Sequence, residues 1–167
     1  SLTGSLTFYR NELFMSDSLI ENNLGEDSIN AIHSTVSIND VDIENSKSDA
    51  IDFDFSRGKV TNGVFSNISG DVIDLSGSKI LISGARIHGV GDKALSVGEA
   101  SHLTASRLDI SDVLIGVASK DGSLVKFSES MISNASFAGI VAYIKKPEYG
   151  PGAIKAFNIT YIDTDVR

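Results

Sequence analysis

Residues 49–76 read DAIDFDFSRGKVTNGVFSNISGDVIDLS, and this stretch contains one complete repeat of the chain. Its opening motif, Asp49-Ala-Ile-Asp52, returns 22 residues later as Asp71-Val-Ile-Asp74. The apolar pair Ile51/Phe53, which begins in this motif, recurs along the whole chain at intervals of 22 or 23 residues. Its members are Leu6/Phe8, Ile29/Ala31, Ile51/Phe53, Ile73/Leu75, Leu95/Val97, Val117/Ser119 and Ile140/Ala142. A fixed period of this length is typical of proteins that stack one coil on the next.

Each repeat contains three short alternating segments that are separated by turns. Alternation of period two indicates strands with one buried face. A chain that turns three times in about 22 residues returns above its own start, so equivalent strands pair in parallel about 4.8 Å apart. We therefore predict an all-β fold, a single-stranded right-handed parallel β-helix of about seven coils of 22–23 residues. The right-handed sense is an expectation from the coil length.

Two columns of polar residues mark the turns. The first column consists of Asn11, Ser34, Ser56, Ser78, Ser101 and Ser123. The second consists of Asn22, Asn45, Asn67, Gly89, Asp112, Asn134 and Asp163. Asn, Asp and Gly tolerate the left-handed backbone conformation of a sharp bend. We expect the Asn column to pass amide hydrogen bonds from coil to coil, as stacked Asn ladders do.

With these coils and this Asn column, the chain resembles the right-handed parallel β-helix repeats of the pectate-lyase-like superfamily. Its short irregular rungs are most similar to the repeats of NosD-like and other bacterial surface β-helix proteins. The resemblance covers nearly the whole chain. It implies the fold and leaves the activity open, because that superfamily includes lyases, hydrolases, epimerases, esterases and adhesins without catalysis.

Composition limits the classes of partner. The 167 residues fit one domain, and both ends stop inside a coil, so we interpret residues 1–167 as a fragment whose partners include other domains of a longer chain. The chain has no cysteine, which excludes disulfides and Cys-ligated metals. The net charge of −8 disfavours binding to nucleic acid and to anionic membranes. It also disfavours binding to an acidic polysaccharide, unless a cation bridges the two. No apolar run predicts insertion into a membrane.

Aspartates at the start of each coil are the first candidate site. Asp49 and Asp71 align with Lys93, and Asp52 aligns with Asp74. Asp54 follows Asp52 on the same outer face, and Arg57 and Lys79 form a basic column close by. Stacked like charges about 5 Å apart repel by roughly 1 kcal/mol in water. The repulsion requires a neutralising partner.

Three interpretations of the aspartates stay open. They are a solvated face that Lys93, Arg57 and Lys79 balance, a calcium site at Asp52, Asp54 and Asp74, or acid–base catalysts drawn from Asp49, Asp52, Asp71, Asp74 and Lys93. Calcium takes six to eight oxygen ligands. Carboxylate pairs catalyse glycoside hydrolysis at separations of roughly 5 to 9.5 Å. In the catalytic interpretation, Lys93, Arg57 or Lys79 would hold a substrate carboxylate.

Residues 143–151 depart from the repeat, because the distance between the two apolar pairs grows by six residues there. This segment contains Tyr143 and Tyr149, which could stack on sugar rings, and both prolines of the chain. The three histidines show no metal-ligand spacing. His33 aligns with Phe55 and is predicted to stack on its ring, and His102 aligns with Arg57 and Lys79.

These features favour a non-catalytic β-helix scaffold or carbohydrate-contacting segment of an exported bacterial protein. It would act outside the cell, at its surface or in the periplasm. Its ligand would be a polysaccharide or cell-surface glycan, bound through Tyr143, Tyr149, Arg57 and Lys79. The alternative is a polysaccharide lyase or glycoside hydrolase of the resembled superfamily. We prefer the scaffold because the aspartates obey the repeat, whereas a catalytic constellation usually interrupts it.

Overall fold

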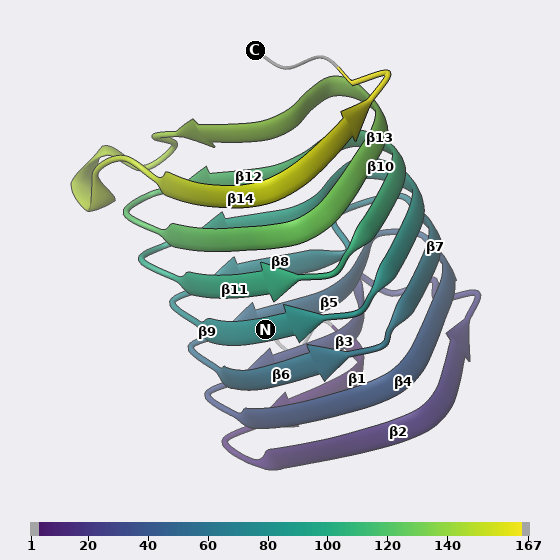
Figure 1. Ribbon diagram of the computed structural model, residues 1–167. Helices are drawn as coiled ribbons and strands as arrows, with labels where there is room; N and C mark the ends of the chain where they lie inside the picture. The colour runs from purple at the N-terminus through teal and green to yellow at the C-terminus, as the bar shows by residue number, and fades with distance from the viewer. Residues whose placement is uncertain (1–3, 165–167) are drawn as a thin grey trace.

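The computed structural model describes residues 4–164 and shows a parallel β-helix with three faces (Figure 1). The first face contains β1 (Gly4–Tyr9), β3 (Asp27–Ile32), β5 (Asp49–Asp54), β8 (Ile73–Ser76) and the ends of β10 (Arg86–Gly98), β12 (Asp109–Lys120) and β13 (Leu124–Tyr143). The second face contains the starts of β2 (Glu12–Glu21), β4 (Thr35–Ser46), β13 and β14 (Ala153–Ile162), with β6 (Arg57–Thr61), β9 (Lys79–Ser83) and β11 (His102–Ser106). The third contains β7 (Val64–Ile68) and the remaining parts of the longer strands.

The predicted register is confirmed strand by strand. Ile51 pairs with Ile73, and Asp52 pairs with Asp74, in the parallel ladder between β5 and β8. Within residues 4–164, each face has seven stacked segments joined by six parallel pairings. The seven predicted coils therefore correspond to about six full turns from the first segment to the last.

Apolar side chains from all three faces fill the interior of the coil. Phe53, Phe65 and Phe127 are among the largest fully buried side chains, and aliphatic residues of neighbouring coils stack between them. Burying a side chain of this kind stabilises the fold by roughly 1.5–3 kcal/mol. On the outside, the predicted contact of His33 with Phe55 is confirmed. Their rings stack with centroids 4.9 Å apart and an angle of 15° between planes.

The two polar columns have different environments. In the Ser column, the Oγ of each serine accepts a hydrogen bond from the backbone N–H of the coil below, for example Ser56 N to Ser78 Oγ at 2.8 Å. These serines are buried. In the Asn column, Asn67 Nδ2 donates to Asn45 Oδ1 at 3.1 Å, but these side chains are exposed. The predicted ladder of Asn amides is therefore confirmed, but it lies on the surface. The ladder that is buried is the one formed by the serines.

The predicted departure lies outside the regular stack. After β13, residues 144–152 leave the coil and form one 3-10 turn, η1 (Pro147–Tyr149), which projects at the left of Figure 1. Within residues 4–164, no helix has the length and apolar character that a membrane-spanning helix needs.

Candidate functional site

Five aspartates on the first face form what we call the carboxylate stack: Asp49, Asp52, Asp54, Asp71 and Asp74. The repeat brings them together because β5 and β8 are adjacent and in register. Asp49 and Asp71 cap the turn between coils. The Oδ1 of Asp49 accepts from the N–H of Asp71 at 2.7 Å, and the Oδ1 of Asp71 accepts from the N–H of Lys93 at 2.9 Å. Both carboxylates thus support the coil geometry.

Asp52 and Asp74 lie in the neighbouring column, above Asn30. The amide of Asn30 donates to Oδ2 of Asp52 at 3.1 Å. Oδ1 of Asp74 makes no hydrogen bond and lies 3.9 Å from Nζ of Lys120. Charge on this face is therefore balanced only in part.

The cations that approach the stack are Lys93 and Lys120. Nζ of Lys93 lies 3.3 Å from Oδ1 of Asp71 and 2.6 Å from Oδ2 of Asp92. Arg57 and Lys79, which the sequence suggested as a balance, lie on the second face and form no ion pair with a carboxylate in the described part of the chain. That interpretation was wrong because the turn at Ser56 separates the two faces.

Lys120 was missed because it acts two coils away from Asp74. Its aliphatic chain covers Gly98, where an added Cβ would lie 2.8 Å from Cε of Lys120. Its Nζ donates to Oγ of Ser96 at 2.8 Å. The sequence does indicate this contact in the column formed by Asp54, Ser76, Gly98 and Lys120. Gly98 has no side chain, so the long side chain of Lys120 can extend over it toward Asp74.

Burial dominates the electrostatics of the stack. Loss of water, with added repulsion from Asp54 and Asp74, raises the pKa of Asp52 from 3.8 to about 8. Burial also raises the pKa of Asp49 to about 7, against the opposing effect of its hydrogen bond from Asp71. It raises the pKa values of Asp54 and Asp71 as well. At neutral pH, the stack therefore retains protons.

The stack also contains a group that fits a cation. Carboxylate oxygens of Asp49, Asp71 and Asp74 all lie within 4.8 Å of one another. This group shares only Asp74 with the predicted calcium set of Asp52, Asp54 and Asp74. Three carboxylates supply part of the six to eight oxygens that calcium takes. Calcium binding stays a prediction.

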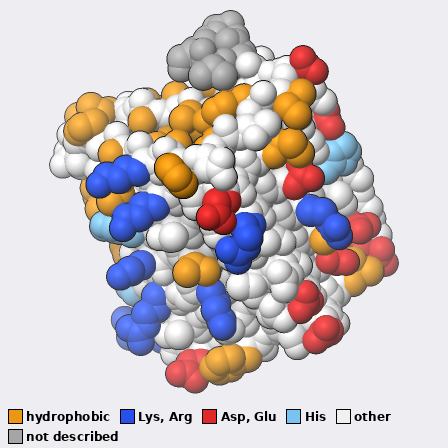
Figure 2. Space-filling model, viewed as in Figure 1, with side chains coloured by type: hydrophobic (Ala, Val, Ile, Leu, Met, Phe, Trp, Pro, Cys, Tyr) orange, Lys and Arg blue, Asp and Glu red, His pale blue; other side chains and the backbone are white. Residues whose placement is uncertain are grey.

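The second face is basic. Five consecutive coils each present at least one outward basic side chain on this face, and β6 presents two. These residues are Arg57 and Lys59 on β6, Lys79 on β9, His102 on β11, Lys126 on β13 and Lys155 on β14. All six are exposed. Figure 2 shows the Lys and Arg side chains gathered over these front strands, with acidic side chains mostly toward the right.

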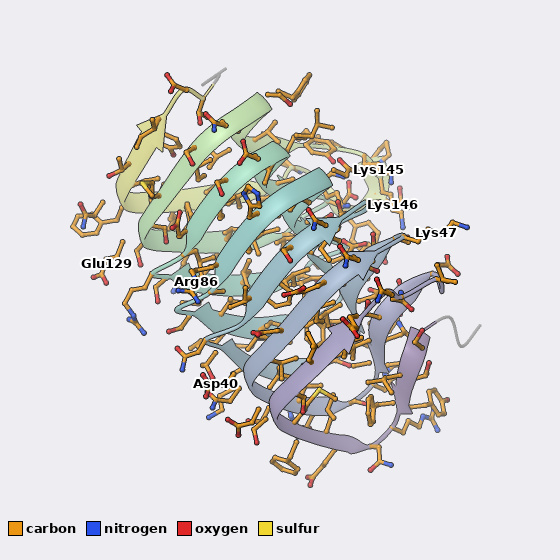
Figure 3. All side chains as sticks on the ribbon, turned by 90° about the vertical axis from the view of Figure 1, so that its right-hand side faces the viewer. Asp40, Lys47, Arg86, Glu129, Lys145 and Lys146 are labelled. Carbon is orange, nitrogen blue, oxygen red and sulfur yellow. The ribbon has the colours of Figure 1, made fainter. Side chains whose placement is uncertain are left out.

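The segments of the second face from β4 to β14 contain no acidic residue, and the exposed Glu12 of β2, in register with Thr35, lies at the N-terminal end of the face. The segments 35–39, 57–61, 79–83, 102–106, 124–128 and 153–157 contain no Asp or Glu. The nearest labelled acidic side chains, Asp40 and Glu129, project at the corner toward the third face (Figure 3). Since charges are screened over about 8 Å at physiological salt, a ligand on the second face meets these cations first.

Two adjoining depressions form a groove along the basic face. One, of about 450 Å³, is lined by Thr35, Arg57, Gly58, Lys79, Ile80, Leu81, His102 and Thr104. The other, of about 160 Å³, is lined by Lys79, His102, Leu103, Thr104, Leu124 and Lys126. Because they share Lys79, His102 and Thr104, the groove crosses strands β4 to β13 and runs along the stacking axis. We call it the axial groove. Sequence reasoning found Arg57, Lys79 and His102 in it and missed Lys126.

The projecting segment is fastened to the coil below. Oδ1 of Asp121 accepts hydrogen bonds from the backbone N–H of Lys145 at 2.7 Å and of Lys146 at 2.5 Å. Nζ of Lys146 also pairs with Glu99. Tyr143 is half-buried, and Tyr149 is 43% exposed, so Tyr149 is the more accessible of the two predicted contact residues.

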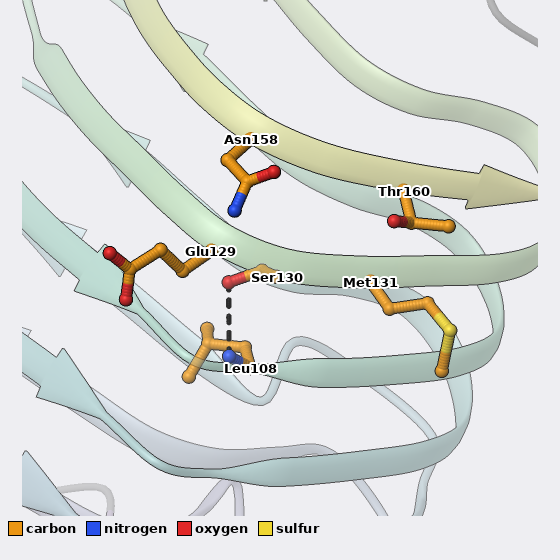
Figure 4. A pocket seen from close by; sticks show the side chains of 6 residues that line it. All are labelled: Leu108, Glu129, Ser130, Met131, Asn158 and Thr160. Carbon is orange, nitrogen blue, oxygen red and sulfur yellow. Dashed lines mark hydrogen bonds between the residues drawn. The ribbon is translucent and has the colours of Figure 1, made fainter.

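A further depression of about 320 Å³ lies at the corner between the second and third faces (Figure 4). Glu129, Met131, Asn158 and Thr160 contribute to its lining. The Oγ of Ser130 in this depression accepts the N–H of Leu108 at 3.0 Å, so that hydroxyl supports the turn. The depression contains one carboxylate and no basic side chain, which separates it chemically from the axial groove.

Comparison with family models gives one match, over residues 27–148, to the family described as "Right handed beta helix region". A comparison with curated proteins gave no significant match. The match covers most of the coils described above and agrees with their parallel stacking. The chain belongs to the right-handed β-helix family.

Proposed function

We propose that this protein is a non-catalytic β-helix scaffold whose axial groove binds an acidic polysaccharide. The observation that carries the proposal is the succession of basic side chains on five consecutive coils, in segments that contain no acid. At a coil spacing of about 4.8 Å, they extend over about 19 Å. A linear polyanion lying along the stacking axis would meet a lysine or arginine on four of these coils and His102 on the fifth.

The spacing supports a glycan over a nucleic acid. A sugar residue in an extended chain advances by about one coil spacing, so anionic sugars can present charges in step with the coils. A DNA duplex carries one charge per about 1.7 Å, and its width would bring it against the neighbouring acidic faces. Acidic glycans of this kind occur outside the cytoplasm, so the proposal implies action at the cell surface, outside the cell or in the periplasm of a bacterium.

The net charge of −8 argued against an acidic ligand, but that argument treats the surface as uniform. The groove cations form no ion pair with a carboxylate in residues 4–164, so they are free to bind an external anion. The acidic groups of the first face lie across the coil, and salt screens them.

The test is binding of polygalacturonate, measured by titration calorimetry at several salt concentrations. Arg57→Gln/Lys79→Gln should lose about tenfold in affinity, equivalent to about 1.4 kcal/mol for two surface ion pairs, and should show a shallower salt dependence. The matched control is Lys47→Gln/Arg86→Gln, which removes the same charges from exposed positions elsewhere (Figure 3). Equal losses in both variants would reject the groove.

A second candidate function, a polysaccharide lyase or glycoside hydrolase, is favoured by one observation. Burial raises the pKa of Asp52 to about 8 and that of Asp49 to about 7, values that suit a general acid near neutral pH. Against it, Asp49, Asp71 and Lys93 are engaged in the hydrogen bonds and ion pairs of the turn. A screen of uronate polymers for new reducing or unsaturated ends would detect such an enzyme.

A further inference from the structure

The larger depression of the axial groove lies where one coil breaks the repeat. Leu13, Val36, Ile80, Leu103, Val125 and Ile154 occupy one inward column of the second face, and Gly58 takes that position on β6. Gly58 has φ +151°, which favours glycine, and an added Cβ would lie 1.9 Å from the carbonyl oxygen of Val36. The missing side chain lets β6 approach β4 closely. The larger depression lies over this point.

The lining of the larger depression combines two chemistries. Ile80, Leu81 and the bare backbone of Gly58 make its lining mainly apolar. Arg57, Lys79 and His102 form one wall, stacked on successive coils. Leu81 lies in the opposite wall, between Lys59 and Thr104 in register, and is 44% exposed although its neighbours in the column are polar or basic. An unsubstituted acidic sugar would use the cations and leave this apolar surface unoccupied.

We infer that the larger depression is a subsite for an acidic sugar residue that carries an O-acyl group. This inference rests on the proposed function and names the substrate class of the same groove. The sugar's anionic group pairs with Arg57 and Lys79, while the acyl methyl packs on Leu81 and the backbone at Gly58. The volume of about 450 Å³ holds a monosaccharide with its substituent.

The experiment compares two probes of equal charge and length, polygalacturonate and the same preparation after partial chemical O-acetylation. Wild-type protein should bind the acetylated polymer about fourfold more tightly, the factor expected for burying one methyl group. In Leu81→Thr, the fourfold preference should disappear, so that the ratio of the two affinities becomes one. Threonine occupies the equivalent position on the next coil, so the substitution suits the strand.

The control is Leu114→Thr, which removes an exposed leucine at the irregularity of β12 between the third and first faces and should keep the fourfold preference. Equal binding of both polymers by wild-type protein would overturn the subsite and leave the groove standing. A preference that persists in Leu81→Thr would also overturn it. Binding of neither polymer would overturn the groove and the subsite together.

Discussion

The retained proton on Asp52 predicts that mild acid stabilises the fold. The pKa of Asp52 is about 8 in the folded protein, where burial raises it, against an ordinary value of 3.8. Between these two values the folded state binds a proton that the unfolded state does not, so the free energy of unfolding falls as pH rises. Stability from this group is complete below about pH 4 and is lost as pH rises through 8.

The magnitude follows from the shift. Each pH unit inside the window changes the free energy of unfolding by about 1.4 kcal/mol, which gives an upper limit of about 4 kcal/mol between pH 5 and pH 8. Asp52 is half-buried, and water reaches part of its carboxyl group, so we expect about 2 kcal/mol. Asp52→Asn mimics the protonated form, keeps the side-chain volume, and should remove this part of the pH dependence.

The assay is urea unfolding at pH 5, 6, 7 and 8, compared between the wild type and Asp52→Asn. The variant should equal the wild type near pH 5 and exceed it by about 2 kcal/mol at pH 8. Asp109→Asn, at an exposed aspartate of β12, is the control and should follow the wild type throughout. Parallel pH profiles for the wild type and Asp52→Asn would refute the reasoning.

Three further predictions concern the turns, the cation and the projecting segment. Ser78→Ala should lower the free energy of unfolding in urea by about 1–3 kcal/mol, because it leaves the buried N–H of Ser56 without an acceptor. Asn67→Ala, at the exposed ladder, should lower it by less. Equal losses in the two variants would contradict the assignment of the buried column. Calcium should raise the melting temperature by several degrees in the wild type and not in Asp74→Asn, and no shift in the wild type would reject the cation site. Tyr149→Ala should weaken polygalacturonate binding about threefold without changing the melting temperature, whereas unchanged affinity would exclude Tyr149 from the contact surface.

The stacking of coils could be predicted from sequence because the repeat acts through local rules. Alternation places Ile51 and Phe53 inward, and a period of 22 residues then fixes Asp52 over Asp74 and His33 over Phe55. Each of these contacts lies one coil apart at a known register. Local pattern and global fold agree along the whole chain, which is typical of designable repeat architectures.

The features that could not be predicted are those that the 22-residue repeat does not determine: the burial of each turn column and contacts that span more than one coil. Pattern alone could not tell which turn column is buried, because Ser78 and Asn67 are both small polar residues at bends. Lys120 reaches Asp74 only because Gly98 leaves space between them. The extension of the basic column to Lys126 and Lys155 was not predicted, because these two residues lie in a different column from Arg57 and Lys79. Only the three-dimensional stack brings the two columns together on one face.

The most direct test of the proposed function is a map of the binding face by two-dimensional NMR. Addition of polygalacturonate oligomers should shift backbone and side-chain signals of Arg57, Lys79, His102 and Lys126, on four successive coils of the second face. Signals of Asp52 and Asp74 on the first face should stay unchanged. Shifts confined to the carboxylate stack, with the groove unaffected, would contradict the account.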